Sequence, residues 1–180
     1  NKVAKKFPEK ACPIQIDNNY KKTNQILARA LITKAFDIEL PQDAFADFKG
    51  LYRRQEIIFE ANNKKIIADY AHHPTEIRAT LTSAQNYPHK DIWCVFQPHT
   101  YTRTKAFINE FAEVLKKAEN VIIADIYAAR EKDEGKIHSR DFACAMEEKG
   151  MNVKYMPEYE KVADYIEKTA VDGDIVLVIG

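Results

Sequence analysis

Residues 91–125, DIWCVFQPHTYTRTKAFINEFAEVLKKAENVIIAD, contain the pattern that decides the fold. Short runs rich in Val, Ile and aromatic residues predict two buried strands, DIWCVFQ (91–97) and NVIIAD (120–125). Between them, apolar residues recur with spacings of four, three, one and three, which predicts a helix with one buried face. This apolar stripe consists of Phe107, Phe111, Val114, Leu115 and Ala118. A strand, a helix and a strand in succession predict a right-handed crossover between parallel strands.

The same alternation continues after this stretch. The sequence predicts a helix at 139–149, a strand at NVKYM (152–156), a helix over residues 159–166 and a final strand at DIVLVIG (174–180). Short strands rich in Val and Ile that alternate with helices predict a mainly parallel sheet with helices on both faces. The expected fold is therefore α/β and Rossmann-like.

An antiparallel hairpin is predicted at the N-terminal start of this sheet. Two β-rich runs, QEIIFE (55–60) and KIIADY (65–70), are joined by Asn62 and Asn63, which tolerate the positive φ of a tight turn. A helix with Pro74 in its first turn follows the hairpin, since proline is favoured at that position.

The first fifty residues have a different pattern. Residues 1–19 are rich in Lys and Pro and predict a loop or the edge of a strand. Apolar spacing predicts a helix over 22–36, and Pro41 opens a shorter helical stretch (41–49) that Gly50 ends. Because this segment has no core of its own, a domain boundary is expected near Gly50.

Composition limits the classes of partner. The chain has 27 Lys and Arg against 27 Asp and Glu, so it has no basic field for nucleic acid or for an anionic membrane. No apolar run approaches the roughly 18 residues of a membrane span, and no signal peptide is recognisable. The three cysteines form no C-x-x-C pair, which favours a reducing compartment, and we expect a cytoplasmic protein. Because the chain opens with Asn1 and stops just after an apolar run, we expect it to be part of a longer protein.

Polar residues gather in three loops that follow predicted strands. The loops read DYAHHPTE (69–76), QPHTYTRT (97–104) and DIYAARE (125–131). Since the carboxyl ends of parallel strands meet at one edge of a sheet, the three loops should share that edge. One polar loop is ordinary, but three in succession predict a functional site.

Several common kinds of site are not supported by the sequence. His72 and His73 are adjacent on an extended segment, so their side chains tend to point to opposite faces and no metal site is expected. Cys94 lies in a predicted strand, Cys144 lies in a predicted helix, and no G-x-S-x-G segment occurs, which argues against covalent catalysis. The five glycines form neither G-x-G-x-x-G nor a P-loop, so a phosphate cradle for ATP would have to come from elsewhere.

Together, the three loops and the segment KGLYRRQE (49–56) resemble the Mur ligases, a family of ATP-dependent amide ligases that build peptidoglycan precursors. The D-Y-A-H-x-P core is shared by several members, whereas HHPTE combined with QPHTYTRT resembles the alanine-adding branch. The resemblance implies a UDP-sugar domain, a central P-loop ATPase and a C-terminal Rossmann-like domain. Residues 51–180 resemble the third domain, and residues 1–50 resemble the end of the second.

Four residues fall on family positions around the incoming amino acid. They are Tyr70, His72, His99 and Arg103. A cation at such a site can hold the carboxylate of alanine, and a neutral imidazole can accept a hydrogen bond from its amine. The resemblance also implies a catalytic role for His72. Thr100 departs from the arginine often found at its position.

Four other residues fall on family positions around ATP. Arg54 matches an arginine that reaches the γ-phosphate and is expected to be catalytic, since a guanidinium suits a phosphoryl group that gains charge during transfer. Asp69 is implied near the ribose, Tyr127 near the nucleotide with Glu131 beside it, and Asn24 at the adenine pocket. The residues alone leave other readings open: a surface charge for Arg54, a helix cap for Asp69, and a run of solvated charges from Glu131 onward.

The resemblance implies a reaction that this chain serves only in part. ATP and Mg²⁺ would activate the carboxylate of UDP-N-acetylmuramate as an acyl phosphate, which the amine of L-alanine then attacks. This chain would supply amino-acid binding and part of the ATP site, and it should be inactive without the rest of the same polypeptide. Two alternatives stay open: a Mur-type ligase that takes a different amino acid or peptide, and a non-catalytic α/β binding module.

Overall fold

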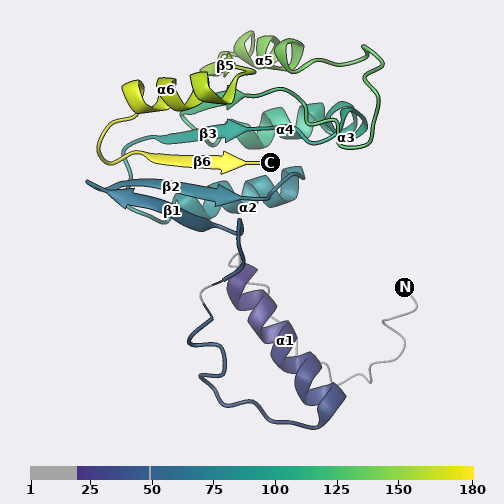
Figure 1. The fold of residues 1–180 in the computed structure, drawn as a ribbon, viewed down its shortest axis with the longest axis vertical. Helices are drawn as coiled ribbons and strands as arrows, with labels where there is room; N and C mark the ends of the chain where they lie inside the picture. Colours follow the sequence, from purple (N-terminus) through teal and green to yellow (C-terminus); the bar gives the residue numbers. More distant parts are fainter. Residues whose placement is uncertain (1–19, 49) are drawn as a thin grey trace. The chain divides into compact units, whose positions relative to one another are not determined.

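The computed structural model describes residues 20–48 and 50–180. Two compact units make up the chain, Asn1–Gly50 and Leu51–Gly180 (Figure 1). The loop or strand edge predicted for residues 1–19 lies outside the described residues. Across the described part of the chain, no helix combines the length and the apolar character needed to cross a bilayer.

The first unit contains helix α1 (Tyr20–Phe36), which confirms the predicted helix. Arg29 of this helix contacts the segment that follows it. Its guanidinium donates to the carbonyls of Leu40 at 2.6 Å and Gln42 at 3.1 Å, and it lies 5.7 Å from the centre of the Phe45 ring. One side chain therefore holds the segment after α1 against the helix.

The second helix predicted for residues 41–49 is wrong over its described residues, which form turns instead. A helix would pair the carbonyl of Gln42 with the amide of Ala46. Ala46 donates instead to the Asp43 carbonyl at 2.7 Å, and the Gln42 carbonyl accepts from Arg29. The amides of Ala44 and Phe48 likewise donate to the carbonyl three residues earlier, so the segment forms successive turns and not an α-helix.

Six strands of the second unit form one sheet in the order β1-β2-β6-β3-β4-β5 (Figure 1). Their bounds are β1 (Glu56–Ala61), β2 (Lys64–Asp69), β3 (Ile92–Phe96), β4 (Asn120–Ile123), β5 (Val153–Tyr155) and β6 (Ile175–Ile179). β1 and β2 are antiparallel, and the other neighbouring pairs are parallel. The hairpin turns through Asn62 and Asn63 at φ values of 50° and 59°. The mainly parallel sheet and its N-terminal hairpin are confirmed.

Helices cover both faces of the sheet, as predicted. Their bounds are α2 (Pro74–Ala84), α3 (Tyr101–Ala106), α4 (Ile108–Leu115), α5 (Ser139–Glu147) and α6 (Tyr159–Thr169). Buried residues of α2, α4 and α5 share one core, which includes Phe111 and Phe142. Val162 of α6 belongs to a second core with Trp93 and Val176. The sheet therefore separates two apolar layers, which is the arrangement of a three-layer α/β domain.

The helix predicted between β3 and β4 is interrupted. Phe107 adopts φ −118° and ψ 20°, which ends α3 and begins α4. Phe111, Val114 and Leu115 of the predicted stripe are fully buried on α4, and Ala118 lies after the helix. The ring of Phe107 itself packs edge-on against His73 with centroids 4.7 Å apart. The break thus turns the first member of the stripe toward the loop after β2.

The strand order determines where the site lies. β6 is inserted between β2 and β3, so Asp69, Ile179, Phe96 and Ile123 are direct register partners across four neighbouring strands. Each of these residues is the last of its strand. The carboxyl ends of β2, β3 and β4, from which the three polar loops depart, therefore form one continuous edge.

Candidate functional site

The three polar loops lie together at this edge, as predicted. His99 and Tyr127 form a parallel bridge, in which the amide of Thr100 donates to the Tyr127 carbonyl and the amide of Tyr127 donates to the Pro98 carbonyl, both at 2.8 Å. The first loop reaches the second through His72, whose ring centroid lies 5.6 Å from that of His99. Backbone pairing and ring contacts therefore join all three loops.

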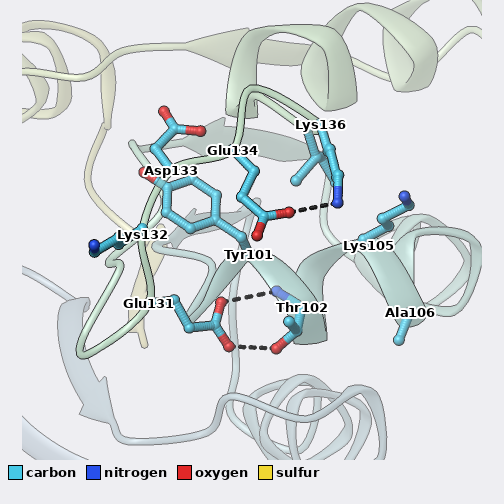
Figure 2. A pocket seen from close by; sticks show the side chains of 10 residues that line it. Tyr101, Thr102, Lys105, Ala106, Glu131, Lys132, Asp133, Glu134 and Lys136 are labelled. Carbon is cyan, nitrogen blue, oxygen red and sulfur yellow. Dashed lines mark hydrogen bonds and ion pairs between the residues drawn. The ribbon is translucent and has the colours of Figure 1, made fainter.

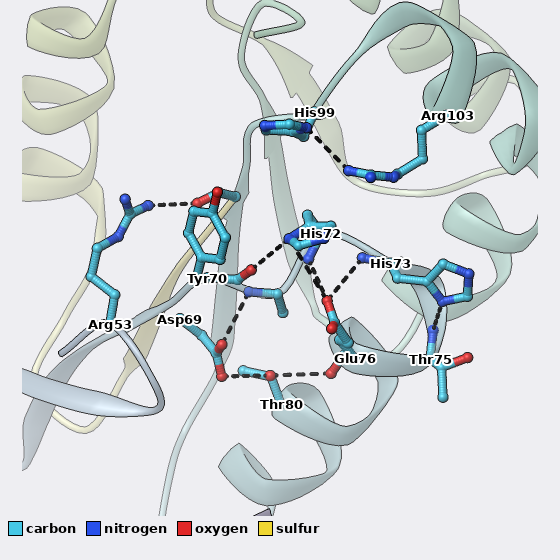
Figure 3. Close-up of polar contacts among 12 residues, drawn as sticks. Arg53, Asp69, Tyr70, His72, His73, Thr75, Glu76, Thr80, His99 and Arg103 are labelled. Carbon is cyan, nitrogen blue, oxygen red and sulfur yellow. Dashed lines mark hydrogen bonds and ion pairs between the residues drawn. The ribbon is translucent and has the colours of Figure 1, made fainter. Parts of the chain in front are cut away.

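Four rings from these loops form a continuous series, which we call the aromatic row: Tyr70, His72, His99 and Tyr127. Successive centroids are 5.2 Å, 5.6 Å and 5.3 Å apart, and the first three residues can be followed in Figure 3. Tyr127, at the far end, is 54% exposed. Three of the four residues predicted for the amino acid and one predicted for the nucleotide are therefore neighbours in one row.

Two arginines flank the Tyr70 end of the aromatic row. The guanidinium carbons of Arg53 and Arg54 lie 5.2 Å and 5.6 Å from the centre of the Tyr70 ring. Arg53 is held in place because its Nη2 donates to the Gly180 carbonyl at 2.5 Å (Figure 3). Among the described residues, no hydrogen bond or ion pair occupies the Arg54 guanidinium. Its donors are therefore available to a ligand.

Asp69 anchors the first loop from inside the molecule. The residue is 2% exposed, and its carboxylate accepts from the Ala71 amide at 3.0 Å and from the Thr80 hydroxyl at 2.8 Å (Figure 3). Burial raises the pKa of the Asp69 carboxyl, and the hydrogen bonds from Thr80 and Ala71 and the charge of Arg54 oppose that rise. Asp69 is not a helix cap, because the N-cap of α2 is His73.

The two adjacent histidines have different neighbours. Nδ1 of His72 lies 2.9 Å from the Tyr70 carbonyl. Because a carbonyl only accepts, Nδ1 carries the hydrogen, and Nε2 keeps a free lone pair in the neutral ring. Nδ1 of His73 instead accepts from the Thr75 amide at 3.3 Å, and the amides of both histidines donate to Glu76. His73 therefore caps α2, whereas His72 belongs to the aromatic row. No group of three metal-ligating side chains occurs in residues 20–48 and 50–180.

His99 and Arg103 form a polar pair beside His72. Nη1 of Arg103 lies 3.1 Å from Nδ1 of His99, and since a guanidinium only donates, Nδ1 is the acceptor and Nε2 carries the hydrogen. Burial, the charge of Arg103 and the proximity of His72 lower the pKa of His99, while Glu131 opposes this shift. The edge thus presents a cationic fork on Arg103, a donor on His99 and an acceptor on His72.

Thr100, in the second loop, has a backbone conformation that L-residues rarely adopt. Its φ is 66° and its ψ is 143°, which typically costs about 1–3 kcal/mol. Its carbonyl accepts from the amide of Thr104 at 3.1 Å and from the hydroxyl of Thr104 at 2.7 Å. The surrounding hydrogen bonds therefore hold the second loop in a shape that it would not adopt alone.

Asn24 is an exposed residue of α1 in the first unit. Its contact with adenine stays a prediction. The other predicted site residues come together at the carboxyl edge of the sheet. They are Arg54, Asp69, Tyr70, His72, His99, Arg103 and Tyr127.

A cavity of about 650 Å³ lies beside the start of α3 and was not predicted (Figure 2). Three lysines and three acidic residues line it, together with an aromatic ring and small side chains. They are Tyr101, Thr102, Lys105, Ala106, Glu131, Lys132, Asp133, Glu134, Lys136 and Ile137. In the sequence, this region is a run of charged residues, which is equally typical of a solvent-exposed loop and does not by itself predict a cavity. Sequence reasoning also missed that Glu131 contacts Thr102 across the two loops.

A family model described as "Mur ligase, glutamate ligase domain" matches residues 53–180. The chain therefore belongs to the Mur ligase family. UDP-N-acetylmuramate–L-alanine ligase from Agathobacter rectalis is 46% identical to it over 159 residues, which cover 88% of this chain and 35% of that protein. The chain spans about a third of the length of the curated relatives that it matches.

Solved structures share the fold. The crystal structure of a UDP-N-acetylmuramate–alanine ligase from Thermotoga maritima matches 92% of this chain and 35% of its own, with a TM-score of 0.72 and 22% identity. A bifunctional folylpolyglutamate and dihydrofolate synthase from Yersinia pestis, solved with AMPPNP and a Mn ion, matches 90% of this chain and 36% of its own, with a TM-score of 0.64 and 17% identity. At these identities the likeness confirms the α/β fold alone.

Proposed function

We propose that this chain is the part of a cytoplasmic ligase that binds L-alanine and closes on ATP while alanine is joined to UDP-N-acetylmuramate. The observation that carries the proposal is the polar pair His99 and Arg103 beside His72 at the carboxyl edge of the sheet. Relatives named UDP-N-acetylmuramate–L-alanine ligase at 44% and 46% identity support the choice of substrates. Since the chain spans about a third of those relatives, the reaction also needs the rest of the polypeptide.

The amino acid has complementary groups in this site. The carboxylate of alanine is assigned to the guanidinium of Arg103, whose planar fork suits bidentate recognition. The Nε2–H of His99 is a second donor to the same carboxylate. The free Nε2 of His72 is assigned to the amine, from which it accepts a proton as the amine becomes a nucleophile. His72 is therefore the catalytic residue on the amino-acid side.

ATP and its metal are assigned only in part to this chain. ATP supplies the phosphoryl group that makes the muramyl carboxylate an effective acylating agent. The unoccupied donors of Arg54 suit a phosphoryl group, and the exposed ring of Tyr127 suits a nucleotide base or ribose. Since the described residues bring together no three metal-ligating side chains, no ligand of Mg²⁺ is assigned here.

Amino-acid specificity separates this function from its alternatives. The test measures phosphate release and amide formation by the full-length enzyme that contains this chain, with ATP, Mg²⁺, UDP-N-acetylmuramate and a panel of amino acids including L-alanine and glycine. Turnover that depends on L-alanine supports the proposal. Preference for another amino acid or for a peptide identifies a different Mur-type ligase, and absence of turnover with every acceptor identifies a binding module. The isolated 180 residues should ligate nothing.

A further inference from the structure

We propose that Glu131 is a positioning residue, which holds the first turn of α3 so that Arg103 receives the amino-acid carboxylate. This inference rests on the function proposed above. Both carboxylate oxygens of Glu131 contact Thr102: Oε2 accepts from its backbone amide at 2.9 Å, and Oε1 accepts from its hydroxyl (Figure 2). Thr102 immediately precedes Arg103, so the contact acts one residue from the predicted carboxylate site.

The amides in the first turn of α3 need a hydrogen-bond acceptor from outside the helix. The first amides of a helix have no partner within the helix, and the cap inside this loop is weak, because the Thr100 hydroxyl oxygen lies 3.4 Å from the Arg103 amide. The first turn of α3 has no acidic residue of its own. The carboxylate of Glu131, from another loop, supplies an acceptor for the Thr102 amide in this turn.

The third loop contacts the second at two points, on either side of the strained Thr100 backbone. The Tyr127 carbonyl accepts from the amide of Thr100, and Glu131 binds Thr102. Between these contacts, Thr100 keeps its unfavourable φ of 66°. Loss of the Glu131 contact would let the turn relax toward ordinary backbone angles. Because Arg103 lies on the freed turn, its guanidinium would leave the position that it now holds against His99.

The reading of Glu131 as a solvated charge does not explain these contacts. A solvated carboxylate would have no fixed partner, whereas Glu131 takes a backbone donor and a side-chain donor from the same residue. The hydrogen bonds from Thr102 also lower the pKa of Glu131. Glu134, in the same loop, pairs with the neighbouring Lys136 instead. Glu134 is therefore a matched control of equal charge.

The kinetic test uses the full-length enzyme that contains this chain. Glu131→Gln should raise the KM for L-alanine about tenfold, the effect of one charge-assisted hydrogen bond. The kcat at saturating alanine and the KM for ATP should stay within about twofold of wild type. Thr102→Ser should keep the alanine KM and Thr102→Val should raise it, while Glu134→Gln should leave every parameter unchanged. An unchanged alanine KM in Glu131→Gln, or an equal loss in all parameters, would overturn the proposal.

A second measurement separates this inference from the proposed function. The titratable and charged groups that face His99 are Arg103, His72, Glu131 and Tyr127. Arg103 lowers the pKa of His99, so a turn that releases Arg103 should let this pKa rise. In the 180-residue chain, Thr102→Val keeps the charge of Glu131 and should raise the pKa of His99 measured by NMR, whereas Thr102→Ser should not. A raised pKa in a chain whose parent does not use alanine leaves Glu131 as a positioning residue and rejects the function. An unchanged pKa in Thr102→Val rejects the role of Glu131 itself.

Discussion

Nη1 of Arg103 lies 3.1 Å from Nδ1 of His99, and this contact assigns the hydrogen-bonding roles of the two His99 nitrogens. Since the acceptor nitrogen of His99 is occupied, His99 can offer a ligand only the hydrogen on Nε2. His72, whose Nδ1 donates to the Tyr70 carbonyl, offers a lone pair on Nε2. Two imidazoles with centroids 5.6 Å apart therefore present opposite polarity to one ligand.

The first prediction concerns the titration of His99. Its pKa should lie below the ordinary 6.5, because burial and the nearby cation of Arg103 disfavour the charged ring. Arg103→Ala should raise this pKa, whereas Arg78→Ala, an exposed cation on α2, should leave it unchanged. NMR titration of the 180-residue chain measures both. Equal values in wild type and Arg103→Ala would contradict the prediction.

The same shift has a consequence for stability. A histidine whose pKa is lowered by folding contributes stability that is fully present above its unfolded pKa, near 6.5. That contribution is lost as the pH falls from this value toward the folded pKa. In urea unfolding between about pH 7 and pH 5, wild type should therefore lose more stability than His99→Gln. A parallel pH dependence of the two proteins would count against the shift.

The second prediction concerns the two adjacent histidines. His72→Asn removes the acceptor assigned to the alanine amine and should lower the kcat of the full-length enzyme on the order of 100-fold, as expected when a general base is lost. His73→Asn keeps a favourable N-cap residue on α2 and should leave kcat within about twofold of wild type. The kcat of each variant is measured at saturating concentrations of all substrates. Equal losses in both variants would show that the difference between the rings is irrelevant to catalysis.

The third prediction concerns the buried carboxylate beneath the first loop. Thr80→Val removes the hydroxyl that donates to Asp69 at 2.8 Å. It should reduce the free energy of unfolding by about 1–3 kcal/mol, because a buried acceptor loses its partner. Thr80→Ser retains the donor and should cost less. Urea unfolding of the second unit measures both, and equal stability of the Val and Ser variants would contradict the role of this hydrogen bond.

The fourth prediction concerns the glycine that follows β6. A Cβ on Gly180 would lie 2.5 Å from the Gln97 carbonyl oxygen, whereas a Cβ on Gly150 would meet no atom within 4 Å. Both glycines have positive φ, so both alanine variants suffer a backbone cost of about 1–2 kcal/mol. Gly180→Ala should be clearly less stable than Gly150→Ala in thermal unfolding. Similar losses in the two variants would show that the close approach to Gln97 is tolerated.

Much of the fold follows from local patterns. Alternation and helical spacing predicted the six strands because most of them are rich in Val and Ile and because helices such as α2 and α4 bury one apolar face. The hairpin was predicted because Asn62 and Asn63 favour left-handed φ. The insertion of β6 between β2 and β3 was not predicted, since strand order depends on packing between distant segments that local patterns do not encode. The short helix expected after Pro41 was wrong: the segment forms turns with hydrogen bonds three residues apart, and Arg29 of the preceding helix contacts it.

The candidate site was predicted in part. Resemblance of the loop motifs identified the members of the aromatic row, and strand direction predicted that their loops share an edge. The roles of individual nitrogen atoms depend on side-chain contacts, so His72 and His99 could not be distinguished from the sequence. Glu131 was expected beside Tyr127 near the nucleotide, but its contact with Thr102 was not predicted, because that contact exists only once the loops are folded together.

The KM for L-alanine in Arg103 variants of the full-length enzyme is the most direct test of the proposed amino-acid site. Arg103→Ala should raise this KM on the order of 10- to 100-fold, the loss expected for a charged hydrogen-bonding partner. Arg103→Lys should fall between Ala and wild type because it keeps the charge without the planar fork. The KM for ATP should stay within about twofold of wild type. An unchanged KM for alanine, or an effect confined to ATP, would contradict the assignment of this edge to the amino acid.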